Sequence, residues 1–404
     1  MSNNNEKVKG FLAINAGSSS LKFGLYVASQ DKPLLAGNCE RIGFSGSFIK
    51  IKDVDGKALA LPENCNLENH TAAVRVVISA LEMHLPMVTV AAAGHRVVHG
   101  GSAYDGPVLI NDEVLANLES FIKLAPLHQP HNLSGIYAMM ENFPTIPQLA
   151  CFDTAFHLNQ DFENKAFALP YRYYEEGIVR YGFHGLSYDY INTEVARLEP
   201  QLHQGKVVVA HLGNGTSLCA IENGKSKESS MGFTVLDGLP MGTRCGQLDP
   251  GVVLHFLETE GLSVAQVSRM LYHESGLLGL SGGLSNDIRT LSEAGTEAAA
   301  RAISYFVTKI RAGIASMAAA MQGVDLIVFT AGIGENSALI REKVCEGLAW
   351  LGVDFDHARN NEVDGLSVIS TDQSKVKVMV IPTNEELVIT RSARKFVSLK
   401  ADAA

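Results

Sequence analysis

The chain has 404 residues, more than a single hydrophobic core usually serves, so two domains are expected. Apolar residues make up 46% of the chain and charged residues 19%, a composition that excludes a disordered protein. With 33 Lys and Arg against 43 Asp and Glu the formal net charge is −10, which argues against nucleic acid as a partner because nucleic-acid-binding proteins carry a basic surface.

The cysteines and the chain ends favour a cytoplasmic protein. The six cysteines are scattered without a C-x-x-C pair, as expected for thiols in a reducing compartment rather than for disulfides or zinc ligands. The N-terminal MSNNNEKVKG lacks the apolar segment of a signal peptide, and no run approaches the ~18 apolar residues of a membrane span. We therefore expect no membrane partner, and frayed ends at residues 1–8 and Lys400–Ala404.

The predicted elements alternate between strands and helices along the chain. A strand is predicted in FLAINAGSSS (11–20) and another in 87–101, followed by a helix after Asn111 and Asp112. Strands in 146–156 and in VVVAHLGNGTS (207–217) come next. Apolar residues at helical spacing then predict a helix between Glu297 and Met321, before strands in LIVFTAGIGENS (326–337) and in 375–386.

This alternation predicts an α/β fold. The segments at 11–20 and 207–217 share one design, an apolar strand followed by Gly with Asn or Ser, and they begin about half a chain apart. That spacing is expected if one domain type occurs twice, with a boundary near residue 155.

No segment matches the phosphate-binding loop G-x-x-x-x-G-K-[ST]. Asn223-Gly224-Lys225-Ser226 copies the end of that motif, but Cys219 stands where its first glycine belongs, and Asn-Gly is better interpreted as a hairpin turn. Hydroxyls and backbone N–H groups at strand ends also bind phosphate, and three segments with glycine offer them. The candidates are Asn15, Ser18, Ser20 and Lys22, then His211, Leu212, Gly213, Asn214 and Gly215, and lastly Gly332, Ile333, Gly334, Glu335 and Asn336. The alternative is that all three are ordinary hairpins or βα turns.

Two arginines and two histidines lie in loops rich in Gly or Pro. They are Arg96 in GHRVVHGG, Arg244 in MGTRCGQLDPG, His128 in LAPLHQPHN and His184 in RYGFHG. Together such groups can hold a small anion and a transferring phosphoryl group, although any single histidine is more often structural.

Carboxylates end two of the predicted strands. Asp153 follows QLACF, and Glu385 and Glu386 follow VKVMVIPTN. Open α/β sheets keep their sites at the carboxyl ends of strands, and one or two carboxylates with water is how Mg²⁺ is held beside nucleotide phosphates. The alternative is helix capping by Asp153 and a solvated pair that opens the last helix.

Two further patterns are weak. The pairs His95 with His99 and His128 with His131 lack a third ligand at zinc spacing. Gly279–Gly283 fits the nucleophile motif G-x-S-x-G, but the sequence around it predicts a glycine-rich loop instead of the required strand and helix, which disfavours a serine hydrolase.

Nine strings in order from residue 15 to residue 386 resemble the acetate kinase family: NAGSSSLKF, GHRVVHGG, LAPLH, FDTAFH, RYGFHG, HLGNG, MGTR, TAGIGEN and PTNEE. The resemblance implies an ATP-dependent kinase that converts acetate reversibly to acetyl phosphate by direct in-line transfer, with Mg²⁺ or alternatively Mn²⁺. It implies two duplicated ribonuclease-H-like domains with an active-site cleft between them, 1–155 with the C-terminal helix 386–404, and 156–385. A homodimer and a cytoplasmic setting are also implied.

The same resemblance implies a role for each matching residue. Asn15, Asp153 and Glu385 act on Mg²⁺, and Ser18, Ser20 and Lys22 support the first phosphate loop. Arg96 binds the acetate carboxylate, Arg244 holds the carboxylate and the phosphoryl group, and His184 hydrogen-bonds the phosphoryl oxygens with His128 in support. ATP phosphates lie against His211–Gly215 and Gly332–Asn336, and adenosine near Asp287, Ile288 and Arg289. The substrate methyl is walled by Val98, Leu127, Phe183 and Val235.

Some positions depart from the usual pattern of that family. Val235 replaces a proline beside the acetate, Leu186-Ser187-Tyr188 stands where Thr-Ser-His is frequent, Gln129 replaces an asparagine, and Cys245-Gly246-Gln247 replaces Ser-Gly-Asp. One methylene in an apolar pocket is worth only ~1–3 kcal/mol, so a propionate or butyrate kinase remains an alternative. A second alternative is a nucleotide-gated binding module of the actin or heat-shock type, which needs no pocket for a small acid.

Overall fold

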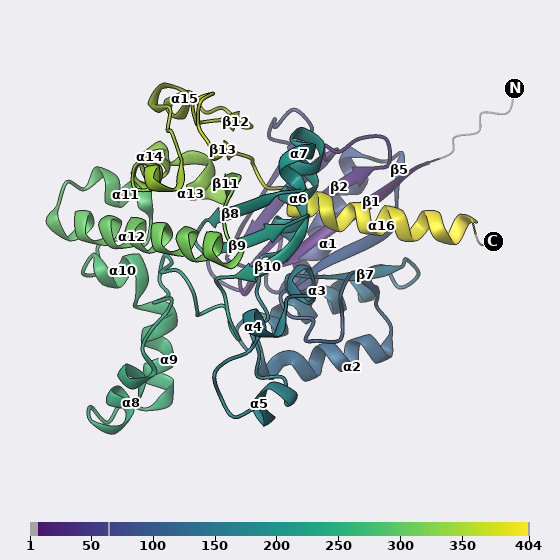
Figure 1. The fold of residues 1–404 in the computed structure, drawn as a ribbon. Coiled ribbons are helices and arrows are strands. Elements are labelled where there is room, and N and C mark those ends of the chain that lie inside the picture. Colours follow the sequence, from purple (N-terminus) through teal and green to yellow (C-terminus); the bar gives the residue numbers. More distant parts are fainter. Residues whose placement is uncertain (1–6, 64, 403–404) are drawn as a thin grey trace, which may run out of the picture. The chain divides into compact units, whose positions relative to one another are not determined.

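The computed structural model describes residues 7–63 and 65–402. The chain forms two compact units, each with one β-sheet (Figure 1). Unit 1 comprises the chain up to Ala155 together with the segment from Asn384 onward. Unit 2 comprises Phe156–Thr383.

Unit 1 is built on a seven-stranded sheet in the order β4-β3-β2-β1-β5-β7-β6. The first four strands pair antiparallel in sequence, β5 and β7 run parallel to β1, and β6 is antiparallel to β7. The strands are β1 (Val8–Ala16), β2 (Ser20–Val27), β3 (Leu35–Glu40), β4 (Phe48–Asp53), β5 (Val88–Val97), β6 (Val108–Leu109) and β7 (Gln148–Phe152).

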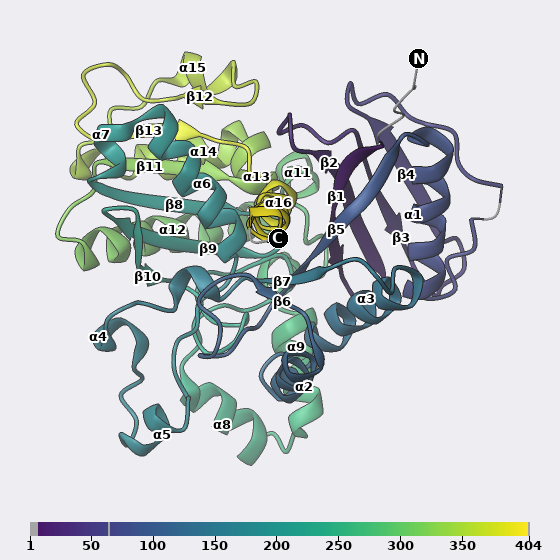
Figure 2. The same ribbon diagram turned by 90° about the vertical axis from the view of Figure 1, so that its right-hand side faces the viewer.

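Helices pack on both faces of this sheet, because alternate residues of a strand point to opposite faces. Leu12 and Ile14 of β1 pack with α1 and α3, which Figure 2 shows beside the sheet, whereas Phe11 packs with Ala393 of α16. A Cβ on Gly94 would lie 2.3 Å from Ile389 Cγ2, so a larger residue there would push α16 away from β5. The helices are α1 (His70–His84), α2 (Asp112–Ser120), η1 (Phe121–Lys123), α3 (Gln129–Asn142) and α16 (Glu385–Asp402), and η2 (Ala155–His157) lies at the junction with unit 2.

Unit 2 is built on a six-stranded sheet in the order β10-β9-β8-β11-β13-β12. β8, β9 and β10 pair antiparallel in sequence, and β11 and β13 run parallel to β8. The strands are β8 (Lys206–Leu212), β9 (Thr216–Glu222), β10 (Lys225–Ser229), β11 (Leu326–Thr330), β12 (Ser367–Val368) and β13 (Lys377–Val380).

Two long helices cover the two faces of this second sheet. Val208 and Ala210 face α12, and Val207 and Val209 face α6. The helices of unit 2 are α4 (Phe162–Lys165), α5 (Arg172–Glu175), α6 (Gly185–Leu198), α7 (Pro200–His203), α8 (Pro250–Glu258), α9 (Val264–His273), α10 (Gly276–Leu280), α11 (Ile288–Glu293), α12 (Glu297–Ala320), α13 (Ala331–Asn336), α14 (Ala338–Glu346), η3 (Ala349–Leu351) and α15 (His357–Asn361). Within unit 2, α8 and α9 extend away from the sheet (Figure 1).

The two sheets share one topology. In each, three antiparallel strands are followed by two strands parallel to the first, and edge strands β4, β6 and β12 are additions to this common set. The duplicated α/β fold predicted from the sequence is therefore confirmed. Each sheet is covered by a helix that lies outside the run of its own strands in the sequence. α6 comes between the strands of unit 1 and those of unit 2, and it packs in unit 2. α16 follows the strands of unit 2 but packs in unit 1.

Four predictions about local structure need correction. Val8 is not frayed, because it pairs with Val88 in the sheet, and the helix α16 extends through Lys400 to Asp402; residues 1–6, 403 and 404 lie outside the described residues. Gly276–Leu280 of the predicted glycine-rich loop is a short helix. The segment after β11 is the helix α13 rather than an open turn.

Candidate active site

Arg96, Asp153 and Glu385 form an ion cluster in unit 1, called here the carboxylate cluster. Arg96 and Asp153 come from the ends of the neighbouring parallel strands β5 and β7, and Glu385 is the first residue of α16. Arg96 Nε lies 3.0 Å from Asp153 Oδ1 and Nη2 lies 2.6 Å from Oδ2, a bidentate pair with both hydrogen bonds donated by the guanidinium. Arg96 Nε lies 3.6 Å from Glu385 Oε2.

Negative charge exceeds positive charge in this cluster. Burial raises the pKa of Glu385 to about 7, an effect that Arg96 opposes and the nearby Asp153 carboxylate strengthens. Burial alone would lower the pKa of Arg96, but the carboxylates of Asp153 and Glu385 raise it above its usual value. One arginine thus faces two carboxylates, with Glu386 paired to Lys22 at 3.9 Å beside them. Another cation would relieve this excess.

The turn between β1 and β2 carries the first predicted phosphate group. Asn15 pairs with Lys22 across the hairpin, and the Gly17 N–H donates to Ser20 O at 2.9 Å to close the turn. Ser18 is exposed, and the side chain of Lys22 is 65% exposed. The side chains of Ser18 and Lys22 are therefore accessible to a ligand that binds to unit 1.

A buried asparagine that was not predicted from the sequence fixes this turn to β5, the strand that carries Arg96. Asn132 on α3 donates to Ala16 O at 2.9 Å and accepts from the Val98 N–H at 2.9 Å. It therefore holds the ends of β1 and β5, which carry Asn15 and Arg96. A single asparagine in the sequence gives no signal for such a role.

The residues predicted to wall the substrate methyl differ in exposure. Val98 and Phe183 are buried, Leu127 is 42% exposed, and Val235 is half-buried. Val98 and Leu127 belong to unit 1, and Phe183 and Val235 to unit 2. His128, predicted to support His184 at the phosphoryl oxygens, is the residue that precedes the first turn of α3 in unit 1.

The histidines of the pair His95 and His99 are structural groups. His95 is buried with Nε2 2.8 Å from Gln148 Oε1, and burial lowers the pKa of His95 to about 4. Burial does the same to the pKa of His99, whose Nδ1 accepts from the Gly101 N–H at 2.9 Å. Both rings are neutral at pH 7 and neither forms a group of three metal ligands among the described residues.

Unit 2 contains a cavity of about 600 Å³, called here the glycine-lined cavity, and many residues predicted to bind nucleotide line it. From the predicted set these are Gly213, Asn214, Asp287, Ile288, Arg289, Gly332, Ile333 and Asn336. The sequence missed Asn286, Ser292, Glu293, Ser337, Ala338 and Leu339. His211, Leu212, Gly215, Gly334 and Glu335 do not line it, and Leu212 is instead part of the core.

The topology of the sheet explains why distant segments meet at this cavity. β8 and β11 are parallel neighbours, with His211 paired to Thr330, so the residues after both strands lie at one edge of the sheet. The loop after β8 is closed by Gly213 N–H donating to Gly215 O at 3.1 Å. A Cβ on Gly242 would lie 2.3 Å from Asn214 Oδ1, so the loop that carries Arg244 approaches this one closely.

Arg341 supports α13, the third predicted phosphate segment. It is 2% exposed and its Nη1 donates to Gly334 O at 3.0 Å and Glu335 O at 2.8 Å. Its Nε donates to Asn360 Oδ1 at 2.8 Å. Burial lowers the pKa of Arg341. No pattern in the sequence distinguishes Arg341 from the other arginines of the chain.

His184 lies in a hydrogen-bonded network in unit 2. Its backbone is left-handed, with φ 59°, at the start of α6. Its Nδ1 lies 2.7 Å from Ser217 Oγ, and its ring stacks on His211 with centroids 4.2 Å apart. His211 Nδ1 lies 2.9 Å from Ser187 Oγ, so both histidines are oriented by serine hydroxyls.

Arg244 is held by the loop that contains it. Its Nη1 donates to Val235 O at 3.0 Å, and its backbone carbonyl accepts from Met241 N at 3.0 Å. Gly276, with φ +61°, lies against this loop, because a Cβ there would be 2.1 Å from Met241 O. The guanidinium is half-buried within unit 2.

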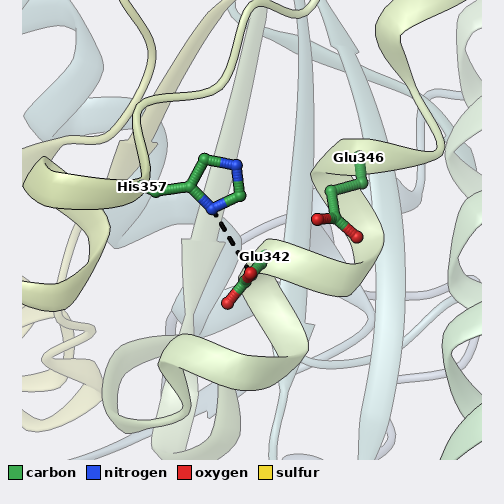
Figure 3. Close-up of side chains that lie close together, drawn as sticks. All are labelled: Glu342, Glu346 and His357. Carbon is green, nitrogen blue, oxygen red and sulfur yellow. Dashed lines mark ion pairs between the residues drawn. The ribbon is translucent and has the colours of Figure 1, made fainter.

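Two other features of unit 2 involve no predicted site residue, although the first shares Ser292 and Leu339 with the lining of the glycine-lined cavity. A cavity of about 630 Å³ between α11, α12 and α14 is lined by none of the predicted site residues. Figure 3 shows Glu342, Glu346 and His357, the one cluster of three potential metal ligands found in 7–63 and 65–402, with His357 Nδ1 3.3 Å from Glu342 Oε1. Glu346 and His357 are exposed, and the cluster shares no residue with the predicted magnesium ligands.

The serine of the G-x-S-x-G pattern does not have the surroundings of a nucleophile. Ser281 follows the short helix α10 rather than a strand, and its hydroxyl donates to Leu278 O at 3.0 Å. Among the described residues, no strand lies between β10 and β11, the part of the chain that contains Ser281. These contacts indicate a structural serine.

Two findings concern the cysteines and the helices of the described residues. None of the six cysteines, all of which are described, forms a disulfide. Within the described residues, no helix combines the length and apolar character needed to cross a bilayer.

Comparison with known proteins gives consistent matches over nearly the whole chain. The model of the acetokinase family matches residues 10–391. A protein of Methylocella silvestris named acetate kinase is 48% identical over 395 residues, covering 94% of this chain and 96% of that protein. The solved structure of Porphyromonas gingivalis acetate kinase is 38% identical, covers 96% of this chain and 100% of its own, and gives a TM-score of 0.88. A propionate kinase from Francisella tularensis is 37% identical, with coverage of 95% and 98% and a TM-score of 0.87.

Proposed function

The chain belongs to the acetokinase family, and from this premise we propose that it is an acetate kinase. It transfers the γ-phosphoryl group of ATP to acetate, giving acetyl phosphate and ADP, and it runs the same reaction in reverse. The observation that carries this proposal is the glycine-lined cavity, where residues from three distant segments predicted to bind nucleotide come together.

The two units divide the work of this reaction. In unit 2, Gly213, Asn214 and Gly332 contact the phosphates, and Asp287 and Arg289 contact adenosine. Backbone N–H groups of glycine loops suit this task because they approach phosphate oxygens closely and add no side-chain bulk.

In unit 1, the carboxylate cluster holds Mg²⁺. Asp153 and Glu385 offer carboxylate oxygens and Asn15 an amide oxygen, the donor types that Mg²⁺ prefers, and the excess negative charge around Arg96 favours a further cation. When bound, Mg²⁺ neutralises charge on the nucleotide phosphates. Its binding requires Glu385 to lose its proton, so affinity rises with pH through the raised pKa of that group.

The remaining residues act on the carboxylate and the phosphoryl group. Acetate is already ionised at neutral pH, so it attacks phosphorus without a general base. Arg96 binds the acetate carboxylate while its other face remains on Asp153. Arg244 neutralises charge on the acetate and the phosphoryl oxygens, and His184 donates a hydrogen bond to those oxygens, contributions that matter most in the loose transition state.

A test with a series of acids separates the candidate activities. Purified protein with ATP and Mg²⁺ is offered acetate, propionate and butyrate, and acyl phosphate is trapped as hydroxamate while ADP is measured in parallel. We expect the highest kcat/KM with acetate. Highest kcat/KM with propionate favours the propionate kinase alternative, to which the Francisella tularensis structure gives support. Carboxylate-independent ADP release without hydroxamate favours the nucleotide-gated module instead.

The proposed enzyme is a homodimer. The nine-residue helix α8, PGVVLHFLE, is strongly apolar, yet it has no buried residue, and Leu254 on it is 53% exposed. Monomers rarely leave such a helix face in water, so a second copy is its natural cover. Leu254→Arg should convert the dimer to monomers in sedimentation velocity, and a wild-type chain that sediments as a monomer would contradict the assignment.

We also place the enzyme in the cytoplasm, without nucleic-acid or membrane partners. Six cysteines without a disulfide suit a reducing compartment, and ATP and ionised acetate are both available there. Fractionation of cells of the source organism tests the location directly.

A further inference from the structure

The side chain of His184 is held by a chain of two buried hydroxyls. Tyr188 Oη lies 2.5 Å from Ser217 Oγ, and Ser217 Oγ lies 2.7 Å from His184 Nδ1. Tyr188 and Ser217 are both fully buried, so neither hydroxyl exchanges its partner for bulk water. Every proton in this chain therefore needs an acceptor within the protein.

That requirement fixes the direction of the two hydrogen bonds. Ser217 Oγ is the acceptor that the structure gives to the Tyr188 hydroxyl, and burial raises the pKa of Tyr188 well above its usual value, so the phenol keeps its proton and donates it. Ser217 then directs its own proton to His184 Nδ1. The reverse order would leave the buried phenol proton without an acceptor, which is destabilising.

A hydrogen bond accepted at Nδ1 determines the tautomer of the ring. The neutral form of the ring has one N–H and one acceptor nitrogen, so in that form the proton of His184 resides on Nε2. Nε2 lies on the side of the loop after β8, where a Cβ on Gly215 would be only 3.1 Å from it. The N–H donor of His184 is thereby presented beside the loop to which the nucleotide phosphates are assigned.

The backbone of His184 shows that this placement is imposed. A φ of 59° is uncommon for residues other than glycine, and such a conformation persists only where the surroundings favour it. Stacking on His211, which is itself held by Ser187, restricts the ring plane as well. The ring is thus fixed in position by its backbone, its stacking partner and the hydroxyl chain.

We propose that Ser217 and Tyr188 are positioning residues that set the tautomer of His184, so that its Nε2–H serves as the hydrogen-bond donor to the transferring phosphoryl group. The assignment of that group as the recipient rests on the proposed function; the tautomer does not. Neither residue touches the reactants, and both act through the imidazole.

The first test reads the tautomer in the full-length resting protein. ¹⁵N spectra of histidine-labelled protein, with the His184 signals assigned by His184→Asn, report which ring nitrogen is protonated. We expect an Nε2–H form in the wild type and a shift toward the Nδ1–H form in Ser217→Ala. A wild-type ring protonated on Nδ1 would overturn the proposal, whether or not the protein makes acyl phosphate.

The second test separates positioning from folding. Ser217→Ala should lower kcat about 10–100-fold, because the donor to the phosphoryl oxygens is lost from part of the population, while the KM values for ATP and acetate change less than about threefold. Tyr188→Phe keeps the buried ring and removes one hydroxyl, and it should lower kcat about 3–10-fold in the same pattern. Ser217→Thr, which keeps the hydroxyl, should restore most of the turnover.

Tyr104→Phe is the matched control. It removes a tyrosine hydroxyl that accepts a hydrogen bond from Asn117 Nδ2 at 3.0 Å within unit 1, whereas His184 belongs to unit 2, and turnover should stay at the wild-type level. Unchanged kcat in both Ser217→Ala and Tyr188→Phe would refute the positioning role. Failure of the wild type to make any acyl phosphate would refute the proposed function instead, and the tautomer measurement would still decide this inference.

Discussion

Replacing Asn132 with alanine tests how the turn between β1 and β2 is held to β5, the strand that carries Arg96. The asparagine side chain satisfies two backbone groups that are both buried, Ala16 O and Val98 N–H, each at 2.9 Å. Alanine leaves both without a partner, and an unsatisfied buried group costs about 1–3 kcal/mol. The free energy of unfolding should therefore fall by about 2–6 kcal/mol in Asn132→Ala.

Urea unfolding of the ligand-free protein, followed by circular dichroism, measures this loss. The matched control is Asn142→Ala, since Asn142 lies at the end of the same helix and only donates to Ala138 O within it at 2.7 Å. This control should lose less than about 1 kcal/mol. Because Asn132 fixes the strand ends that carry Asn15 and Arg96, kcat/KM should also fall in Asn132→Ala at a temperature where the variant is fully folded. Equal stability of the two variants would refute the reasoning.

Three further changes test the site. Between pH ~4.5 and ~7 the folded chain binds more protons at Glu385 than the unfolded chain does, so the free energy of unfolding of the metal-free wild type should fall as pH rises through this window. Relative to Glu385→Gln the loss should reach up to about 3 kcal/mol, measured by urea unfolding at pH 5 and pH 8. The same pH dependence of stability in the two proteins would show that this carboxyl is not perturbed. Arg244→Ala should lower kcat about 10²–10³-fold in the acyl-phosphate assay while the melting temperature shifts by only a few degrees, and matching losses of fold and activity would indicate a structural role. Arg96→Ala should raise the KM for acetate and, unlike Arg244→Ala, also destabilise the protein by about 3–5 kcal/mol, since it leaves the buried carboxylate of Asp153 unpaired; an unchanged KM would contradict the assignment of Arg96.

Much of the fold follows from local patterns in the sequence. Apolar runs of strand length predict β1, β5, β7, β8, β11 and β13, and the Asn-Gly pair predicts the hairpin between β9 and β10, where Asn223 and Gly224 both have positive φ. Asn111 precedes α2 and accepts a hydrogen bond from Val114 N–H, as its position suggested. These features depend on a few neighbouring residues, so a single sequence contains them.

The parts that the sequence did not reveal depend on contacts between distant residues. Asn132 and Ser217 hydrogen-bond groups 116 and 33 residues away in the sequence, and Arg341 joins Gly334 to Asn360 on another helix. None of the three differs in type from many residues without such a role. Residues of α14 such as Leu339 line the glycine-lined cavity because β8 and β11 are neighbours in the sheet, which is a property of the topology. The return of α16 to unit 1 does not follow from its helix period either, because a helix period does not identify the sheet on which the helix packs; only the family resemblance implied it.

The most direct test of the central claim is a ³¹P NMR spectrum of purified protein with ATP, Mg²⁺ and acetate. The account predicts a growing acetyl phosphate signal with an equal amount of ADP, and its disappearance with re-formation of ATP when excess ADP is added. Consumption of ATP to ADP and inorganic phosphate alone, or no consumption with any short-chain acid, would contradict it.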